Sequence, residues 1–107
     1  RDSYCARIRR IFRERSPGDW PDFKAVAESF HMTRSTLRRR LSYEHISYQS
    51  LKDQVRREWA VAMLKAGGQS NTEIAEKLGF GDPSAFYRAF RKWTGLSPTR
   101  FRDGQHP

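Results

Sequence analysis

The feature that most constrains the fold is a pair of short amphipathic patterns, separated by a tight turn, in the last third of the chain. Ser70 and Glu73 have the spacing of a capping box, in which each side chain bonds to the backbone N–H of the other at a helix start. Gly79 stops the first pattern, and Asp82 with Pro83 begins the second. The inward positions of the two patterns are Ile74, Ala75, Leu78, Phe86, Phe90 and Trp93. Two short helices joined by so short a turn predict a helix-turn-helix.

The helical period also fixes which side chains of the second pattern face outward. Because Phe86 and Phe90 point inward, positions about 100° and 200° away on the wheel must point out. These outward residues are Ser84, Tyr87, Arg88 and Arg91. Their side chains suit base edges and phosphates.

The first half of the chain repeats this unit. A shift of 48 residues places Val26-Ala27-Glu28 on Ile74-Ala75-Glu76, and a shift of 49 places the inward Leu37 and Leu41 on Phe86 and Phe90. Asp22 and Thr33 are the expected caps of the two helices in this copy. The outward positions of its second helix are Ser35, Arg38, Arg39 and Ser42. The repeat therefore predicts two helix-turn-helix units.

His31 stands in the turn where the second copy has Gly79. A left-handed backbone there would cost about 1 kcal/mol for a residue with a Cβ atom, although His tolerates it better than most. We interpret His31 as a turn residue, and predict no metal site because no second ligand lies at metal-binding spacing.

Residues 47–66 contain neither Gly nor Pro, and residues 67–68 are both Gly, so one long helix is expected between the copies. Its twenty residues would span roughly 30 Å, close to the ~34 Å repeat of B-DNA. It could therefore hold two recognition helices about one DNA turn apart. The residues expected to pack from this helix onto the two units are Leu51, Val55, Ala62 and Met63.

Amphipathic helices are also expected at both ends. Residues 3–15 place apolar side chains on one face and arginines around the rest, which favours a core-packing helix over one lying on a membrane. Ser97 opens a last short helix that Gly104 ends, with residues 105–107 expected to fray. The predicted fold is all-α, with seven helices forming two helix-turn-helix subdomains, 1–46 and 67–107, joined by a linker helix, 47–66.

Composition favours a polyanionic partner. The chain has 107 residues, with 21 Lys and Arg against 12 Asp and Glu, a net charge of +9. Its length leaves no room for an enzyme-sized cleft, and no nucleophile elbow, zinc-binding helix or phosphate loop is present. We therefore expect no enzyme and no cofactor.

Cys5 is the single cysteine of the sequence, so an internal disulfide is excluded. A single cysteine fits a reducing cytoplasm, and we expect Cys5 to be a small residue of the hydrophobic core. No membrane-spanning run or signal peptide is visible.

The constrained residues of the second unit resemble the signature of the AraC/XylS family of bacterial transcription regulators. They are Gly79-Phe80, Ser84, Phe86, Arg88, Phe90, Gly95, Pro98 and Phe101-Arg102. The resemblance implies a protein of the cytoplasm and nucleoid that binds double-stranded DNA in successive major grooves and regulates bacterial transcription, with activation expected. It further implies RNA polymerase as a partner and an effector-binding domain upstream of Arg1.

Within that interpretation the outward residues divide into two classes. The expected base readers, by analogy with arginine on guanine O6 and N7, are Ser35, Arg38, Arg39, Ser42, Ser84, Tyr87 and Arg88. The expected phosphate contacts are Arg34, Arg40, Arg91, Lys92 and Arg100. Tyr87 has two possible roles, a phosphate contact or a contact with a thymine methyl.

Two other functions remain open from the sequence. The domain could be fused to a DNA-repair methyl-acceptor enzyme, which only upstream sequence would reveal. It could instead be a protein-interaction module, which predicts no salt-dependent affinity for DNA.

Overall fold

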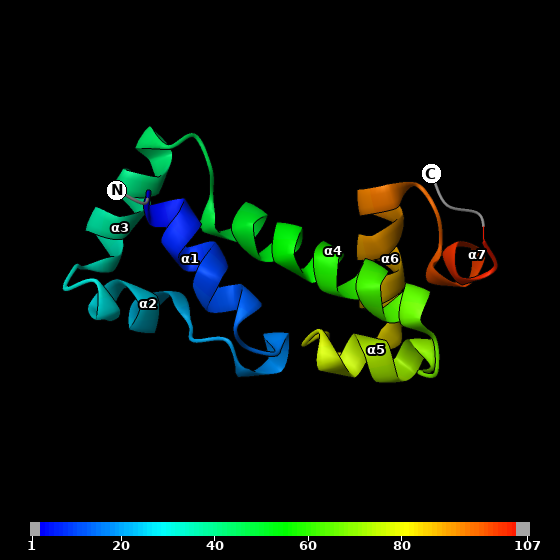
Figure 1. Cartoon of the computed structure of the whole chain (residues 1–107). Helices are drawn as coiled ribbons and strands as arrows, with labels where there is room; N and C mark the ends of the chain where they lie inside the picture. The colour runs from blue at the N-terminus through cyan, green and yellow to red at the C-terminus, as the bar shows by residue number, and fades with distance from the viewer. Residues whose placement is uncertain (1–2, 105–107) are drawn as a thin grey trace. The chain divides into compact units, whose positions relative to one another are not determined.

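The computed structural model describes residues 3–104, and over that range it contains seven α-helices, one 3-10 turn and no strand. In chain order these are α1 (Tyr4–Arg13), η1 (Pro17–Asp19), α2 (Phe23–Ser29), α3 (Arg34–Tyr43), α4 (Tyr48–Ala66), α5 (Asn71–Lys77), α6 (Pro83–Thr94) and α7 (Pro98–Arg102) (Figure 1). The prediction of an all-α fold with seven helices is confirmed. The prediction for residues 105–107 lies outside the described residues.

The chain forms two compact units, Arg1–Val55 (unit 1) and Arg56–Pro107 (unit 2), and the division falls inside α4. This helix is continuous for 19 residues. Leu51 and Val55 are buried in its first half, as predicted, and Met63 packs against the core of unit 2.

The prediction that Ala62 packs inward is wrong, because Ala62 is exposed. Ala60 and Leu64 are the buried residues of this half of α4. They lie four residues apart on one face, and Ala62 is about 200° around the helix from each.

Side-chain caps begin the short helices. The N-cap oxygens that accept a backbone N–H three residues on belong to Ser3, Asp22, Thr33, Ser70, Asp82 and Ser97. Glu73 completes the capping box by accepting from the Ser70 N–H at 2.9 Å. Each of these bonds satisfies an N–H that the helix itself leaves unpaired, so the sequence specifies where the helices start.

The turn inside each helix-turn-helix has the same hydrogen bonds in both units. The N–H of Met32 donates to the Ala27 carbonyl at 2.9 Å, and the N–H of Phe80 donates to the Ala75 carbonyl at 3.0 Å. Each bond runs from the third residue after the end of the helix to the third-last residue of the helix, the pattern of a Schellman motif. Figure 1 shows α2 and α3, and likewise α5 and α6, meeting at these turns.

A left-handed residue makes each of these turns possible. His31 has φ 59° and Gly79 has φ 83°, which confirms the expectation for His31. The ends of α3 and α6 also have left-handed residues, His45 at φ 60° and Gly95 at φ 82°. The sequence did not predict the second of these histidines, so unit 1 uses histidine at both positions where unit 2 uses glycine.

The core of unit 1 joins α1, α2, α3 and the first half of α4. Its buried hydrophobic residues are Ile8, Phe12, Val26, Ala27, Leu37, Leu41, Leu51 and Val55. Trp20 stacks on Phe12 with ring centroids 4.2 Å apart, and its Nε1 donates to the Phe12 carbonyl at 2.9 Å. The indole therefore closes the core without leaving its N–H unpaired.

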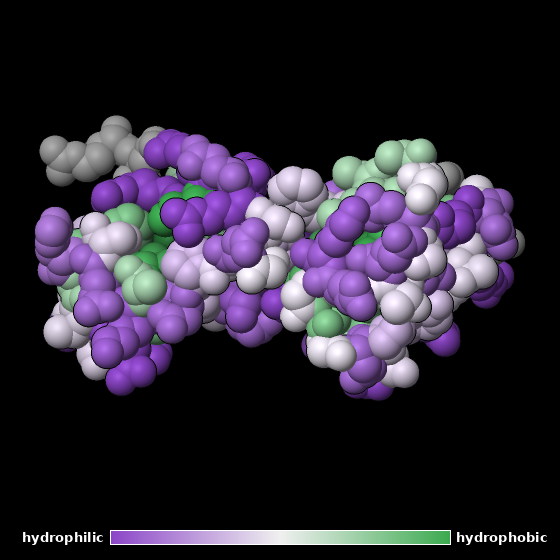
Figure 2. Space-filling model, turned by 90° about the horizontal axis from the view of Figure 1, so that it is seen from below, coloured by the Kyte–Doolittle hydropathy of each residue, from purple (hydrophilic) through white to green (hydrophobic). Residues whose placement is uncertain are grey.

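The core of unit 2 is built around Phe90. Its ring lies edge-on to those of Phe86 and Phe101, with centroids 5.8 Å and 5.4 Å away. The other buried members of the cluster are Ala60, Leu64, Ile74, Ala75 and Leu78. On the face drawn in Figure 2 hydrophilic residues and residues of intermediate hydropathy cover most of the surface, and hydrophobic residues show as a few separate green patches.

Glu44, directly after α3, holds the start of α1. Its carboxylate accepts from the backbone N–H of Tyr4 at 3.0 Å and of Cys5 at 2.9 Å. Burial alone would raise the pKa of Glu44, but these bonds, one from the Cys5 side chain and the charge of Arg9 outweigh it, so the pKa lies below its ordinary value. Cys5 itself is partly buried.

Replacing either left-handed histidine with glycine should stabilise unit 1. A left-handed residue with a Cβ costs about 1–2 kcal/mol, and the extra chain entropy of glycine returns about 0.5–1 kcal/mol of that. His31→Gly and His45→Gly should each gain about 0.5–1 kcal/mol, a rise of roughly 2–8 °C in melting temperature. Gly95→Ala is the matched control with the opposite sign, since an added Cβ meets nothing within 4 Å and only backbone strain remains. Unchanged melting of both histidine variants would contradict the explanation.

Glu44→Gln should destabilise unit 1 by about 1–2 kcal/mol near neutral pH, because a neutral amide caps the Tyr4 and Cys5 N–H groups more weakly. A lowered folded pKa means that the carboxylate stabilises the fold above the unfolded value near 4.5. The advantage of the wild type should therefore disappear as the pH falls below 4.5 through the folded pKa. Denaturant melts at several pH values measure this, with the exposed Glu28→Gln as control. A difference that did not change with pH would rule out the charged cap.

Candidate nucleic-acid interface

The second helix of the unit 1 helix-turn-helix, α3, turns its polar face to solvent. Leu37 and Leu41 are buried, four residues apart, and fix the orientation of the helix. All six residues predicted to contact DNA from this helix are exposed: Arg34, Ser35, Arg38, Arg39, Arg40 and Ser42. Because α3 contains no Asp or Glu, nothing on it repels a phosphate.

The second helix of unit 2, α6, has the same organisation. Phe86 and Phe90 are buried, and α6 also lacks acidic residues. The predicted contact residues on this helix are all exposed: Ser84, Tyr87, Arg88, Arg91 and Lys92. Arg100 is exposed on α7, which contacts α6. The structure thus gathers the predicted residues into two sets, one in each unit.

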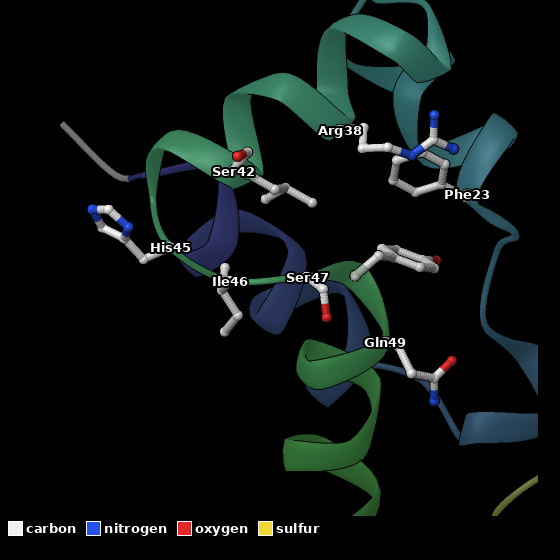
Figure 3. A pocket seen from close by; sticks show the side chains of 9 residues that line it. Phe23, Arg38, Ser42, His45, Ile46, Ser47 and Gln49 are labelled. Carbon is white, nitrogen blue, oxygen red and sulfur yellow. The ribbon is translucent and has the colours of Figure 1, made fainter.

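Arg38 is held against an aromatic ring. Its guanidinium carbon lies 5.4 Å from the centroid of Phe23, which begins α2, and Figure 3 shows the two side chains next to each other. A cation over a ring face is attracted by the ring quadrupole, so Arg38 is restrained while its N–H donors keep their hydrogen-bonding capacity.

Arg38 and Phe23 form one wall of a concavity of about 660 Å³. The residues that line the rest of it are Leu41, Ser42, His45, Ile46, Ser47, Tyr48 and Gln49. Tyr48 donates from its hydroxyl to the Pro21 carbonyl at 3.1 Å. Burial, and then the charge of Asp22, raise the pKa of Tyr48 to about 12, so this donor stays protonated.

Tyr87 belongs to a polar network that joins α5, α6 and α7. Arg102 Nη2 donates to Asn71 Oδ1 at 2.7 Å. Asn71 Nδ2 in turn donates to Tyr87 Oη at 3.0 Å and to Thr99 Oγ1 at 3.1 Å. Sequence reasoning assigned no role to Asn71, Thr99 or Arg102, because their partners are 16 to 31 residues away in the chain. The only signal was that Arg102 lies in the signature stretch.

The network and the concavity occupy equivalent places in the two units. At the shifts of 48 and 49 residues that relate the copies, Phe23 aligns with Asn71 and Arg38 with Tyr87. A shift of 50, which places Ser47 on Ser97 and Leu51 on Phe101, aligns Gln49 with Thr99. Unit 1 therefore holds its outward side chain by an aromatic contact, and unit 2 holds the equivalent one by hydrogen bonds.

Other kinds of site have no support among residues 3–104. No group of three or more His, Cys, Asp or Glu side chains in that range is arranged to hold a metal ion. No helix in the described part of the chain combines the length and the apolar character that a bilayer span needs.

Two helix-turn-helix units with exposed, cationic second helices define a DNA-binding helix-turn-helix domain. A family model described as a helix-turn-helix domain matches residues 26–104. The chain belongs to the AraC-type helix-turn-helix family of DNA-binding transcriptional regulators. The resemblance inferred from the signature residues is thereby confirmed.

Similar proteins and similar solved structures support this family membership. The chain is 41% identical over 102 residues to the "Ornithine utilization regulator" of Pseudomonas aeruginosa, covering 95% of this chain and 30% of that protein. The crystal structure of "transcriptional regulator CdpR" from Pseudomonas aeruginosa matches with a TM-score of 0.83 and 35% identity, over 94% of this chain and 31% of that one. The DNA-binding domain of "AdpA, the global transcriptional factor, in complex with a target DNA" matches with a TM-score of 0.81 and 25% identity, over 96% and 93%.

These proteins are transcriptional regulators rather than enzymes. The chain spans 30% of the length of each of the first two curated relatives, the second being "HTH-type transcriptional regulator VqsM" at 34% identity.

Base readers and phosphate contacts should respond differently to truncation. Arg39→Ala or Arg88→Ala should cost about 1–3 kcal/mol on the preferred duplex and relax the preference at one base pair, because a bidentate contact to guanine is lost. Arg100→Ala should weaken binding to all sequences alike. Selection from random oligonucleotides supplies the preferred duplex, and titrations against it and against random DNA give the two losses. Equal losses on both DNAs for all three variants would contradict the division.

Proposed function

We propose that this chain is the DNA-reading part of a bacterial transcription regulator, and that α3 and α6 each enter a major groove. The observation that carries the proposal is the repeated second helix, which is fixed by two buried side chains and presents an arginine-rich face without any carboxylate. Arginine donors match phosphate oxygens and guanine edges, and the net charge of +9 favours association with a polyanion.

The two grooves are proposed to be successive ones on the same side of the duplex. The helix α4 continues from one unit into the next, and its 19 residues rise by roughly 28 Å. The helical repeat of B-DNA is ~34 Å, so a spacer of this length suits segments about one turn apart. Because the spacer is slightly short, we expect the DNA to bend toward the protein, or one recognition helix to engage loosely.

The site should be asymmetric, because the two faces differ. Unit 1 offers Arg38 and Arg39 at the positions where unit 2 offers Tyr87 and Arg88. Two adjacent arginines can make two bidentate contacts to guanine, whereas unit 2 has one arginine for this purpose. We therefore propose that unit 1 contributes more of the sequence preference, and unit 2 more of the phosphate contact.

The regulator as a whole is proposed to be longer and to respond to an effector. The chain spans 30% of the length of each of two curated relatives, and the family resemblance implies an effector-binding domain and contact with RNA polymerase. Activation is the proposed direction of regulation, and DNA binding would place the protein on the bacterial nucleoid.

Hydroxyl-radical footprinting of one chain on the preferred duplex tests this arrangement. We expect protection of two segments on one face of the DNA, centred about 10 bp apart and different in sequence. Arg39→Ala should weaken protection of one segment more than of the other. Protection of a single segment, or a two-fold symmetric footprint from one chain, would overturn the proposal.

A titration series at different salt concentrations is the control for binding of any kind. If about six phosphates are neutralised, affinity should fall by tens of fold or more between about 50 and about 200 mM salt. A slope near zero would favour a protein-interaction module instead.

A further inference from the structure

The amide of Asn71 can adopt only one orientation in the structure. Arg102 Nη2 lies 2.7 Å from Asn71 Oδ1. An arginine carries donors and no acceptor, so the atom facing it must be the amide oxygen. The amide nitrogen is therefore directed toward α6 and α7.

This orientation fixes the direction of two hydroxyl groups. Asn71 Nδ2 donates one hydrogen to Tyr87 Oη at 3.0 Å and the other to Thr99 Oγ1 at 3.1 Å. Both oxygens act as acceptors toward the amide. A hydroxyl that accepts still has its own hydrogen to donate, and both residues are exposed, so each O–H is available on the outer surface.

The two helices that carry these hydroxyls suit an anion with several acceptor oxygens. Their exposed cations are Arg88, Arg91 and Lys92 on α6 and Arg100 on α7, next to Thr99 in the chain. A phosphate only accepts hydrogen bonds, whereas base edges present donors and acceptors in mixed patterns. The hydroxyl of Tyr87 also lies next to α5, because it accepts from Asn71, and both α5 and α7 contact α6.

On the basis of the proposed DNA binding, we propose that Arg102 and Asn71 are positioning residues that turn the hydroxyls of Tyr87 and Thr99 into a pair of donors for one DNA phosphate. Tyr87 then contributes affinity and register rather than base preference, which decides between its two possible roles. Thr99 becomes a DNA contact that neither the helical wheel nor the signature indicated.

A comparison with unit 1 explains why unit 2 needs residues that position its donors. At the equivalent positions Arg38 carries its own charge and donors, and Phe23 restrains it through the ring face. A tyrosine hydroxyl has a single hydrogen, so its use as a donor depends on a neighbour that leaves that hydrogen pointing outward.

Removing either hydroxyl tests the contact. Tyr87→Phe and Thr99→Val keep the side-chain shape, and each should lower affinity roughly 5- to 10-fold on preferred and random duplexes alike. The salt dependence should stay unchanged, because no cation is lost. Thr99→Ser retains a hydroxyl and is the matched control. A loss confined to the preferred duplex, or no loss from either substitution, would overturn the proposal.

Asn71→Asp tests the positioning. Aspartate has the shape of asparagine and still accepts from Arg102, but it has no hydrogen to donate, so both hydroxyls must donate inward to it. Thermal stability should therefore be retained while DNA affinity falls. A network that served only the fold would instead lower the melting temperature and leave affinity nearly intact.

Asn71→Asp also adds a negative charge, and a mutant cycle separates the effect of that charge from the reorientation of the two hydroxyls. In the Tyr87→Phe/Thr99→Val background there are no hydroxyls to turn, so Asn71→Asp there reports the charge alone. We expect its loss in the wild-type background to be about 10-fold greater. Equal losses in both backgrounds would overturn the positioning role.

The wild type distinguishes failure of this inference from failure of the proposed function. If the wild type shows no salt-dependent affinity for duplex DNA, the proposed function fails. If the wild type binds duplex DNA and the cycle is additive, only the positioning role of Arg102 and Asn71 fails.

Discussion

The direction of each recognition helix depends on one left-handed residue in the turn before it. At His31 and Gly79 the backbone reverses sharply enough for the residue that follows to bond back into the preceding helix. A residue with negative φ at this point would send the next helix elsewhere, and Leu37 or Phe86 would leave its core. The exposed faces of α3 and α6 point where they do because these turns and cores are satisfied together.

Most of the fold was readable from the sequence, because the features that determine it are local. Caps such as Asp22 and Ser70 act within three residues, and the helical period distinguishes Phe90 from Arg91 without any knowledge of the partner helix. Local rules failed where two registers were equally apolar. Ala62 fits an inward stripe as well as Ala60 does until packing against the other helices of unit 2 selects Ala60. The left-handed His45 was missed because histidine gives no turn signal of the strength that Gly95 gives.

The sequence predicted which helix faces of the candidate interface are exposed, but not which contacts hold the exposed side chains. The wheel places Arg38 and Tyr87 outside, and the structure agrees. What holds each of them there is a tertiary contact, with Phe23 in one unit and Asn71 in the other, and periodicity carries no information about such pairs. A repeat alignment does show that the partner positions differ in chemistry. It cannot show that they touch the outward side chain.

The long-range cap supplied by Glu44 affects the order in which the helices of unit 1 fold during synthesis. The two N–H groups it accepts lie 40 and 39 residues earlier in the chain. On a ribosome α1 emerges first and α3 much later, so the first turn of α1 lacks its acceptor until synthesis has passed residue 44. A helix of 10 residues is marginal in water by itself. During synthesis α1 therefore stays largely unfolded until α3, the recognition helix of the same unit, has been completed.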